Sequence, residues 1–77
     1  MARYLKLNRF DAKDVVHRLH IDEDIDQLAE KLRSAGEQDV VEVQAQMDDQ
    51  LRMTPLYIRP WRWDSWMLFE HDPEQPL

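Results

Sequence analysis

The first residues in this chain that could do chemistry are three aspartates at alternating positions, Asp22, Asp24 and Asp26. A calcium loop opens in this way because Ca²⁺ takes oxygen ligands, but the loop also needs a glycine at its sixth position and a glutamate at its twelfth. Counted from Asp22, these positions hold Gln27 and Arg33. We therefore predict no metal site here, and interpret the aspartates as stabilising the positive end of a helix dipole.

Two histidines, His17 and His20, are three residues apart. That spacing puts both rings on one face of a helix, where they could bind zinc, but on opposite faces of a strand. We favour the strand, because a third ligand would have to come from His71 or a distant carboxylate. We predict no cofactor, and a hydrogen-bonded, partly buried His17 at the edge of the core. Its titration near neutral pH could still change stability.

Residues suited to covalent catalysis are scarce. Cysteine is absent, and Ser34 and Ser65 stand outside any nucleophile-elbow sequence. The single glycine, Gly36, cannot build a phosphate-binding loop. A chain of this size also has little room for a pocket on the order of several hundred Å³. We predict a non-catalytic protein, with an enzyme based on paired carboxylates as the remaining alternative.

All three tryptophans lie within six positions, inside residues 57–66, which we name the aromatic–arginine segment. Alternating cations and aromatic rings can stack bases and bind phosphates. The formal net charge of −6 opposes a polyanion, so we expect no direct binding of nucleic acid. Trp, Tyr and Arg are also enriched at the centres of protein interfaces. The candidate partner-binding residues are Tyr57, Arg59, Trp61, Arg62, Trp63 and Trp66.

The elements that position these residues must come from one small domain, since the chain has 77 residues and no cysteine. A domain near this size buries only about 60% of the surface that its unfolded chain exposes, so it depends on aromatic packing or self-association. We expect a single domain over residues 1–71 and a disordered tail over residues 72–77. With no cysteine, apolar leader or long apolar run, we expect a cytoplasmic protein that does not enter membranes.

The clearest predicted element is a helix over residues 23–35. Apolar residues at three- and four-residue spacing define one stripe along it. Asp22 is the expected N-cap, Ile21 the expected hydrophobic staple, and Gly36 the expected left-handed residue after the last turn. The stripe consists of Ile21, Ile25, Leu28, Ala29, Leu32 and Ala35.

Alternating and β-branched patterns predict strands on both sides of this helix. A turn at residues 11–14 joins the first two strands into a hairpin, with a short helix over residues 11–20 as the alternative for the second. A turn at residues 48–50 follows the third strand, while Pro55 opens and Pro60 closes the fourth. The predicted strands cover residues 4–10, 15–21, 40–47, 56–59 and 66–71.

This order, ββαβββ, predicts an α+β fold with two layers, in which one helix packs on a small mixed or antiparallel sheet. We expect the aromatic–arginine segment to form a hairpin that turns at residues 64–65. That turn would place Trp61 and Trp63 on one face and would bring Trp66 beside Trp63 as a cross-strand pair.

The layout resembles the β-grasp, or ubiquitin-like, fold. The resemblance covers the N-terminal hairpin, the acidic cap at Asp22 and the inward-facing Ile25, Leu28 and Leu32 of the helix. The end of the chain lacks the paired glycines through which ubiquitin-like modifiers are conjugated, so a conjugated tag is not implied.

The chain also resembles a group of small, uncharacterised actinobacterial proteins, which implies a bacterial origin but no activity. The shared features are a helix of the type seen at residues 24–28, the strand at residues 40–43, and the late segment at residues 54–58.

One amphipathic helix covers one face of the sheet, and three tryptophans are more than that face can shelter. We therefore expect one or more indoles to stay exposed, and exposed apolar patches mark interfaces. We predict a protein–protein interaction module whose partner is another protein or a second copy, forming a homodimer. Trp61 and Trp63 would anchor the partner, and Arg59 and Arg62 would orient against its carboxylates. The alternative is that the indoles only complete the core.

An acidic surface supports a second hypothesis. Residues 22–49 carry ten acidic residues against two basic ones. Such a surface keeps a small protein soluble, and it can also mask the basic, nucleic-acid-binding surface of a partner, as a decoy or inhibitor does. The residues that would carry this function are Asp24, Asp26 and Glu30.

Overall fold

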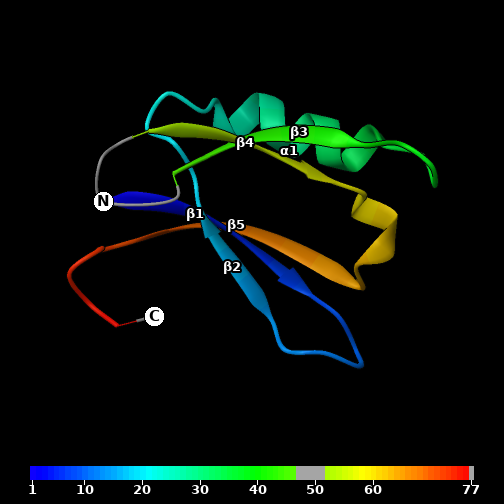
Figure 1. The fold of residues 1–77 in the computed structure, drawn as a ribbon, viewed down its shortest axis with the longest axis horizontal. Coiled ribbons are helices and arrows are strands. Elements are labelled where there is room, and N and C mark those ends of the chain that lie inside the picture. The colour runs from blue at the N-terminus through cyan, green and yellow to red at the C-terminus, as the bar shows by residue number, and fades with distance from the viewer. Residues whose placement is uncertain (47–51, 77) are drawn as a thin grey trace.

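The computed structural model describes residues 1–46 and 52–76. It confirms the α+β class and the predicted order of strands and helix, and it places a strand, not a helix, in the second half of residues 11–20 (Figure 1). The elements are β1 (Ala2–Asn8), β2 (Val15–Arg18), α1 (Ile25–Ser34), β3 (Val41–Gln46), β4 (Met53–Ile58), a single 3₁₀ turn η1 (Pro60–Arg62) and β5 (Ser65–His71).

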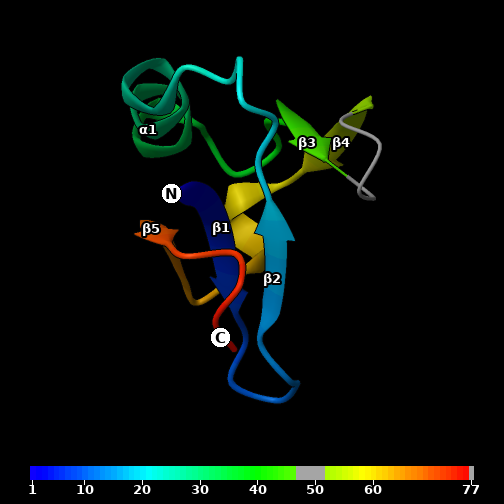
Figure 2. The ribbon, with the colours of Figure 1, turned by 90° about the vertical axis from the view of Figure 1, so that its left-hand side faces the viewer.

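The strands divide between two antiparallel sheets. β1 lies at the centre of the first sheet, with β2 on one side and β5 on the other, and β3 pairs with β4 in the second. A bridge between Leu19 and Ala45 links the two sheets, and the His20 N–H donates to the Gln44 carbonyl across 2.8 Å. Figure 2 shows α1 and the two-stranded sheet on the same side of the three-stranded sheet.

The core lies where these three parts meet. Strand alternation places Leu5 and Leu7 of β1 on the face that looks toward α1, while Tyr4 looks the other way and stacks on Phe69 with ring centres 5.4 Å apart. Val41, Val43 and Ala45, which alternate along β3, are buried on its inward face. The buried core residues are Leu5, Leu7, Leu19, Leu28, Leu32, Val41, Val43 and Ile58.

The start of α1 differs from the prediction. Asp24, not Asp22, is the N-cap, because its Oδ1 accepts hydrogen bonds from the N–H groups of Asp26 (3.0 Å) and Gln27 (3.1 Å). Asp22 belongs to the preceding turn, where its own N–H donates to Nδ1 of His20 across 3.1 Å. Both aspartates are good caps by type, so only this turn decides between them.

Asp26 lies in the first turn, where the helix dipole favours a negative charge as predicted, but two other predictions for the helix ends were wrong. The helix ends at Ala35 in an extended conformation (φ −68°, ψ 135°), and Gly36 is not left-handed. The Gly36 N–H donates to Oδ2 of Asp39 across 2.8 Å, and not to a carbonyl of the last helical turn as a left-handed cap would. Ile21 is 71% exposed and staples nothing, because the helix begins too late to place it next to the cap.

Several strand boundaries also differ from the predicted ones. Pro55 lies inside β4, opposite Gln44, instead of opening the strand. It is tolerated there because β4 is an edge strand, on which a missing N–H breaks no ladder. Phe10 lies beyond the end of β1 and is 97% exposed. The predicted turn at residues 48–50 falls outside the described residues.

After β5 the chain makes a turn at Asp72. The Glu74 N–H donates to Oδ1 of Asp72 (3.0 Å), and the Gln75 N–H donates to its carbonyl (3.1 Å). Asp side chains favour such turns by bonding to the backbone two residues on. The expected disorder of residues 72–77 stays a prediction.

Candidate interaction surface

The aromatic–arginine segment does not fold as the predicted hairpin. β4 pairs with β3 and β5 pairs with β1, so residues 59–64 cross from one sheet to the other. Pro60 begins η1, where its fixed φ suits a first helical position. Trp66 stands opposite Leu7 of β1 and forms no cross-strand pair with Trp63, which lies outside the strands. A local turn signal at residues 64–65 could not reveal this distant pairing.

Trp61 is the indole that faces outward. It is 62% exposed, and its Nε1–H donates to the Ala35 carbonyl across 2.7 Å. Ala35 follows the last turn of α1, where backbone carbonyls lack partners inside the helix. The hydrogen bond therefore satisfies the end of the helix and at the same time holds an exposed ring in one orientation.

Trp63 and Trp66 contribute mainly to the margin of the core. Both are half-buried and pack against the core cluster. The guanidinium of Arg9 lies 5.8 Å from the centre of the Trp63 ring, within the range of a cation–π contact. The expectation that one or more indoles remain exposed is met by Trp61. The strand that was expected to carry Trp61 and Trp63 is not formed, because η1 occupies Pro60–Arg62.

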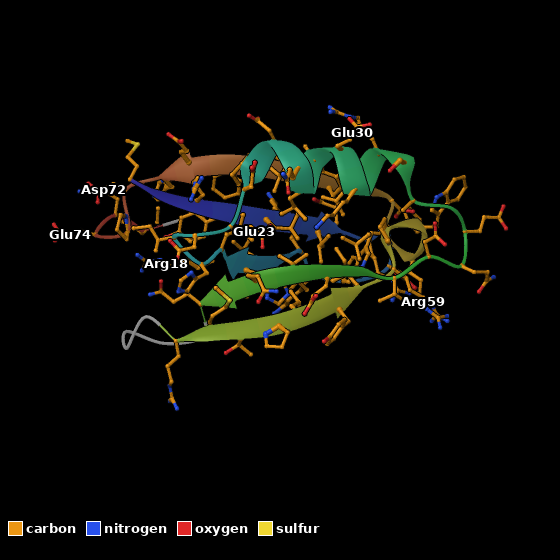
Figure 3. The ribbon with its side chains drawn as sticks, turned by 90° about the horizontal axis from the view of Figure 1, so that it is seen from above. Arg18, Glu23, Glu30, Arg59, Asp72 and Glu74 are labelled. Atoms are coloured by element: carbon orange, nitrogen blue, oxygen red, sulfur yellow. The ribbon has the colours of Figure 1, made fainter. Side chains whose placement is uncertain are left out.

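The other predicted contact residues of the segment are exposed. Arg59 has an extended backbone (φ −106°, ψ 104°), so it projects on the same side as Tyr57, two residues earlier. The Tyr57 hydroxyl donates to Glu42 across 3.3 Å. Neither Arg59 nor Arg62 has an ion-pair partner among residues 1–46 and 52–76. Figure 3 shows Arg59 at the edge of the molecule, pointing away from its body.

Two open hollows adjoin the Trp61–Ala35 contact. The first, of about 400 Å³, is lined by Trp61 together with Trp63, Trp66 and residues around them. The second, of about 380 Å³, is lined by Ala35 and the exposed Val40, with Lys31 and Asp39 at its rim. Each hollow can receive a side chain of a partner on one side of the fixed indole.

The loop between β1 and β2 also reaches this end of the molecule, which the sequence did not indicate. The Phe10 N–H donates to the Asp64 carboxylate, and the Asp64 N–H donates to the Asn8 carbonyl across 2.8 Å. These bonds place Arg9 and the exposed Phe10 beside the aromatic–arginine segment. No local pattern links residues so far apart in the chain.

The acidic residues of the second hypothesis are partly occupied by structural contacts. Asp24 caps the helix, and Oε2 of Glu30 lies 3.1 Å from Nη2 of Arg33. Glu23 lies between α1 and β3 (Figure 3), where its carboxylate accepts from the Gln44 N–H across 2.7 Å. The Asp26 side chain has no hydrogen-bond or ion-pair partner within the described part of the chain.

His17 lies on the face of β2 that looks toward the core, opposite Leu5 of β1. It is half-buried, and the loss of solvent lowers the pKa of its imidazole below the ordinary value of 6.5. The described residues contain no group of three or more His, Asp or Glu side chains placed to hold a metal ion. Within the same residues, no helix has the length and apolar character of a membrane span.

Comparisons with known proteins add no relative. No family model, no curated protein and no solved structure matches this chain.

Proposed function

We propose that this chain is a non-catalytic module that binds an acidic segment of a partner protein through Arg59, Trp61 and Arg62. One observation carries the proposal: the Trp61 indole is fixed by its bond to the Ala35 carbonyl and is still 62% exposed. A ring that is already held in place loses little conformational freedom on binding. Trp and Arg are the residues that most often dominate the energy of protein interfaces.

The charges around Trp61 support an acidic partner. The side chains of Arg59 and Arg62 are exposed and unpaired among the described residues, so their guanidinium groups are available to carboxylates. Arg binds carboxylates with two parallel hydrogen bonds, which adds orientation to attraction. Because residues 22–49 carry ten acidic residues against two basic ones, an acidic segment is repelled from that part of the chain, which favours its approach to Arg59 and Arg62.

Nucleic acid fits this surface less well. Arg9 lies over Trp63, which adds a cation to the site, but the Arg9 guanidinium is also 3.4 Å from the Asp11 carboxylate. Asp64 adds a further negative charge between the loops. Phosphate binding strengthens with the number of cations that neutralise phosphates, and few are present here.

The test is a peptide array probed with the labelled chain. The array carries short acidic peptides, each beside a copy with Asn or Gln at the acidic positions, and also basic peptides and single-stranded oligonucleotides. We expect binding to acidic peptides that weakens with added salt. Trp61→Ala and the pair Arg59→Gln/Arg62→Gln should each reduce this binding by at least about tenfold, the loss expected at an interface hot spot.

The matched control is Arg33→Gln, which removes one exposed arginine from α1 and should leave peptide binding unchanged. Equal binding to acidic peptides and their amide copies would refute the proposal. Binding only to basic peptides, lost on Asp26→Lys, would favour the decoy hypothesis instead. Binding only to oligonucleotides would show that nucleic acid is the ligand.

A further inference from the structure

β5 presents an unprotected edge. It has one hydrogen-bonded neighbour, β1, and Figure 2 shows it at the margin of the three-stranded sheet, on the side away from β2. The strand runs for seven residues and includes one carboxylate, Glu70, and no proline. Long, apolar edges pair readily with another strand, and soluble proteins usually block them with prolines, charges or short strands.

The other three edges of the described strands carry some protection. The outer edge of β3 is partly covered, because Gln44 accepts from the His20 N–H and donates to the Glu23 carboxylate. β4 has Pro55 near its middle, so its outer edge lacks one N–H that an added strand would need. β2 is only four residues long, and the bridge between Leu19 and Ala45 directs the chain to the second sheet directly after it. β5 therefore stands out within the described residues as the edge left open for pairing.

We propose that β5 pairs with β5 of a second copy of this chain, in antiparallel orientation, to form a continuous six-stranded sheet. This surface is separate from the one proposed for acidic partners. Full overlap of two identical seven-residue strands centres the pairing on Leu68, because that register makes the largest number of backbone hydrogen bonds. Met67 then stands opposite Phe69 of the second copy, a favourable sulfur–aromatic pair.

Charge favours this arrangement over a parallel one. In the antiparallel register each Glu70 faces Trp66 of the second copy, and the two glutamates lie about 14 Å apart along the strands. Parallel pairing would set them side by side. With a formal charge of −6 on each chain, two copies repel over most of their surfaces, and β5 offers an approach with few charges. Added salt should therefore strengthen the dimer, whereas it weakens binding of acidic peptides.

A second feature of the outer sheet face agrees with this register. Met67 is 54% exposed and lines an open hollow of about 400 Å³ with Val16, Phe69 and His71. Nε2 of His71 is buried and has no hydrogen-bond partner among residues 1–46 and 52–76. Pairing centred on Leu68 places Ser65 of the second copy directly opposite His71, at the margin of this hollow.

Cysteine cross-linking tests the register, since the chain contains no cysteine of its own. In the double variant Ser65→Cys/His71→Cys, each new thiol faces a thiol of the second copy at about the 4.4–6.8 Å between Cα atoms that a disulfide requires. Within one chain the two thiols lie about 20 Å apart, so an internal disulfide cannot form. We expect a covalent dimer from the double variant and none from either single variant. Equally fast cross-linking of a single variant would overturn the register.

Sedimentation equilibrium tests the dimer without cysteines. We expect the mass of the unmodified chain to rise between about 10 μM and about 1 mM. Met67→Lys should raise the dimer dissociation constant by at least about tenfold, because it places a charge at the pairing edge. The control is Met53→Lys, at a residue on β4 that is 48% exposed, and it should leave the dimer dissociation constant unchanged. A monomer throughout this range, or equal effects of both lysines, would overturn the proposal.

Discussion

Removing the carboxylate of Asp24 should destabilise the protein far more than removing that of Asp22. One oxygen of Asp24 accepts the N–H groups of both Asp26 and Gln27, and Asp24 is the N-cap of the only helix among the described residues. Loss of an N-cap costs about 0.5–2 kcal/mol, and loss of a charge at the helix N-terminus costs about 0.3–1 kcal/mol. The two costs overlap, and we expect about 1.5 kcal/mol for Asp24→Ala.

This loss is large for so small a domain. Each kcal/mol lowers the melting temperature of a 60–100-residue domain by roughly 4–8 °C, so Asp24→Ala should melt about 6–12 °C lower. The Asp22 carboxylate is exposed, and its oxygen is 3.8 Å from Nδ1 of His20, so Asp22→Ala should change stability by less than about 0.5 kcal/mol.

Urea denaturation followed by circular dichroism at 222 nm, which reports helix, measures both effects, with about the same slope for each variant if folding is two-state. Asp24→Asn is the control: it keeps a capping oxygen, removes the charge, and should lose less than Asp24→Ala. A larger loss from Asp22→Ala than from Asp24→Ala would mean that the helix begins where the sequence alone suggested. It would also refute the assignment of Asp24 as a structural residue.

Two further predictions concern the core. Burial holds the pKa of His17 below its unfolded value, so the folded state resists protonation, and stability should fall as the pH drops from about 7.5 toward about 5.5. His17→Gln should flatten this part of the pH profile in urea titrations, and an unchanged profile would contradict the assignment. Leu28→Ala, at a side chain with no exposed surface, should cost about 2–5 kcal/mol. Ile21→Ala should cost less than about 0.5 kcal/mol in the same denaturation assay, and equal losses would contradict the described core.

Local patterns in the sequence were sufficient for the class of the fold and the existence of its main elements. The spacing of Leu28 and Leu32 predicted α1, and the alternation from Val41 to Ala45 predicted β3, because both patterns report a buried face directly. The first residue of α1 could not be predicted with the same certainty, since Asp22 and Asp24 satisfy the same N-cap preference. Only the turn held by the His20 ring distinguishes them.

These local patterns could not predict which strands pair with each other when they are far apart in the chain. A hairpin over residues 57–66 and a crossing between two sheets use the same turn residues, and the choice depends on whether β5 pairs with β4 or with β1. The pairing of Trp66 with Leu7 decides it. The two sheets, the divided roles of the tryptophans and the approach of Phe10 all follow from this one choice.

Residue types predicted where the candidate site lies in the sequence, but the structure gave its residues a different arrangement from the one predicted. The enrichment of Trp and Arg pointed to residues 57–66, and these residues do include an exposed indole. Which indole is exposed depended on η1, where Pro60 turns the chain and breaks the two-residue alternation of a strand. The bond from Trp61 to Ala35 depends on the end of α1 lying nearby, which no local signal contains.

The most direct test of the central claim is ¹⁹F NMR of the chain labelled with 5-fluorotryptophan. The chain has three tryptophans, and Trp61→Phe assigns the signal of Trp61 by removing it. An acidic peptide from the array is then added in steps. We predict that the Trp61 signal moves on binding, and that it moves more than the signals of Trp63 and Trp66, because Trp61 is 62% exposed and the other two rings are half-buried at the margin of the core. A Trp61 signal that stays in place while the peptide binds would contradict the account.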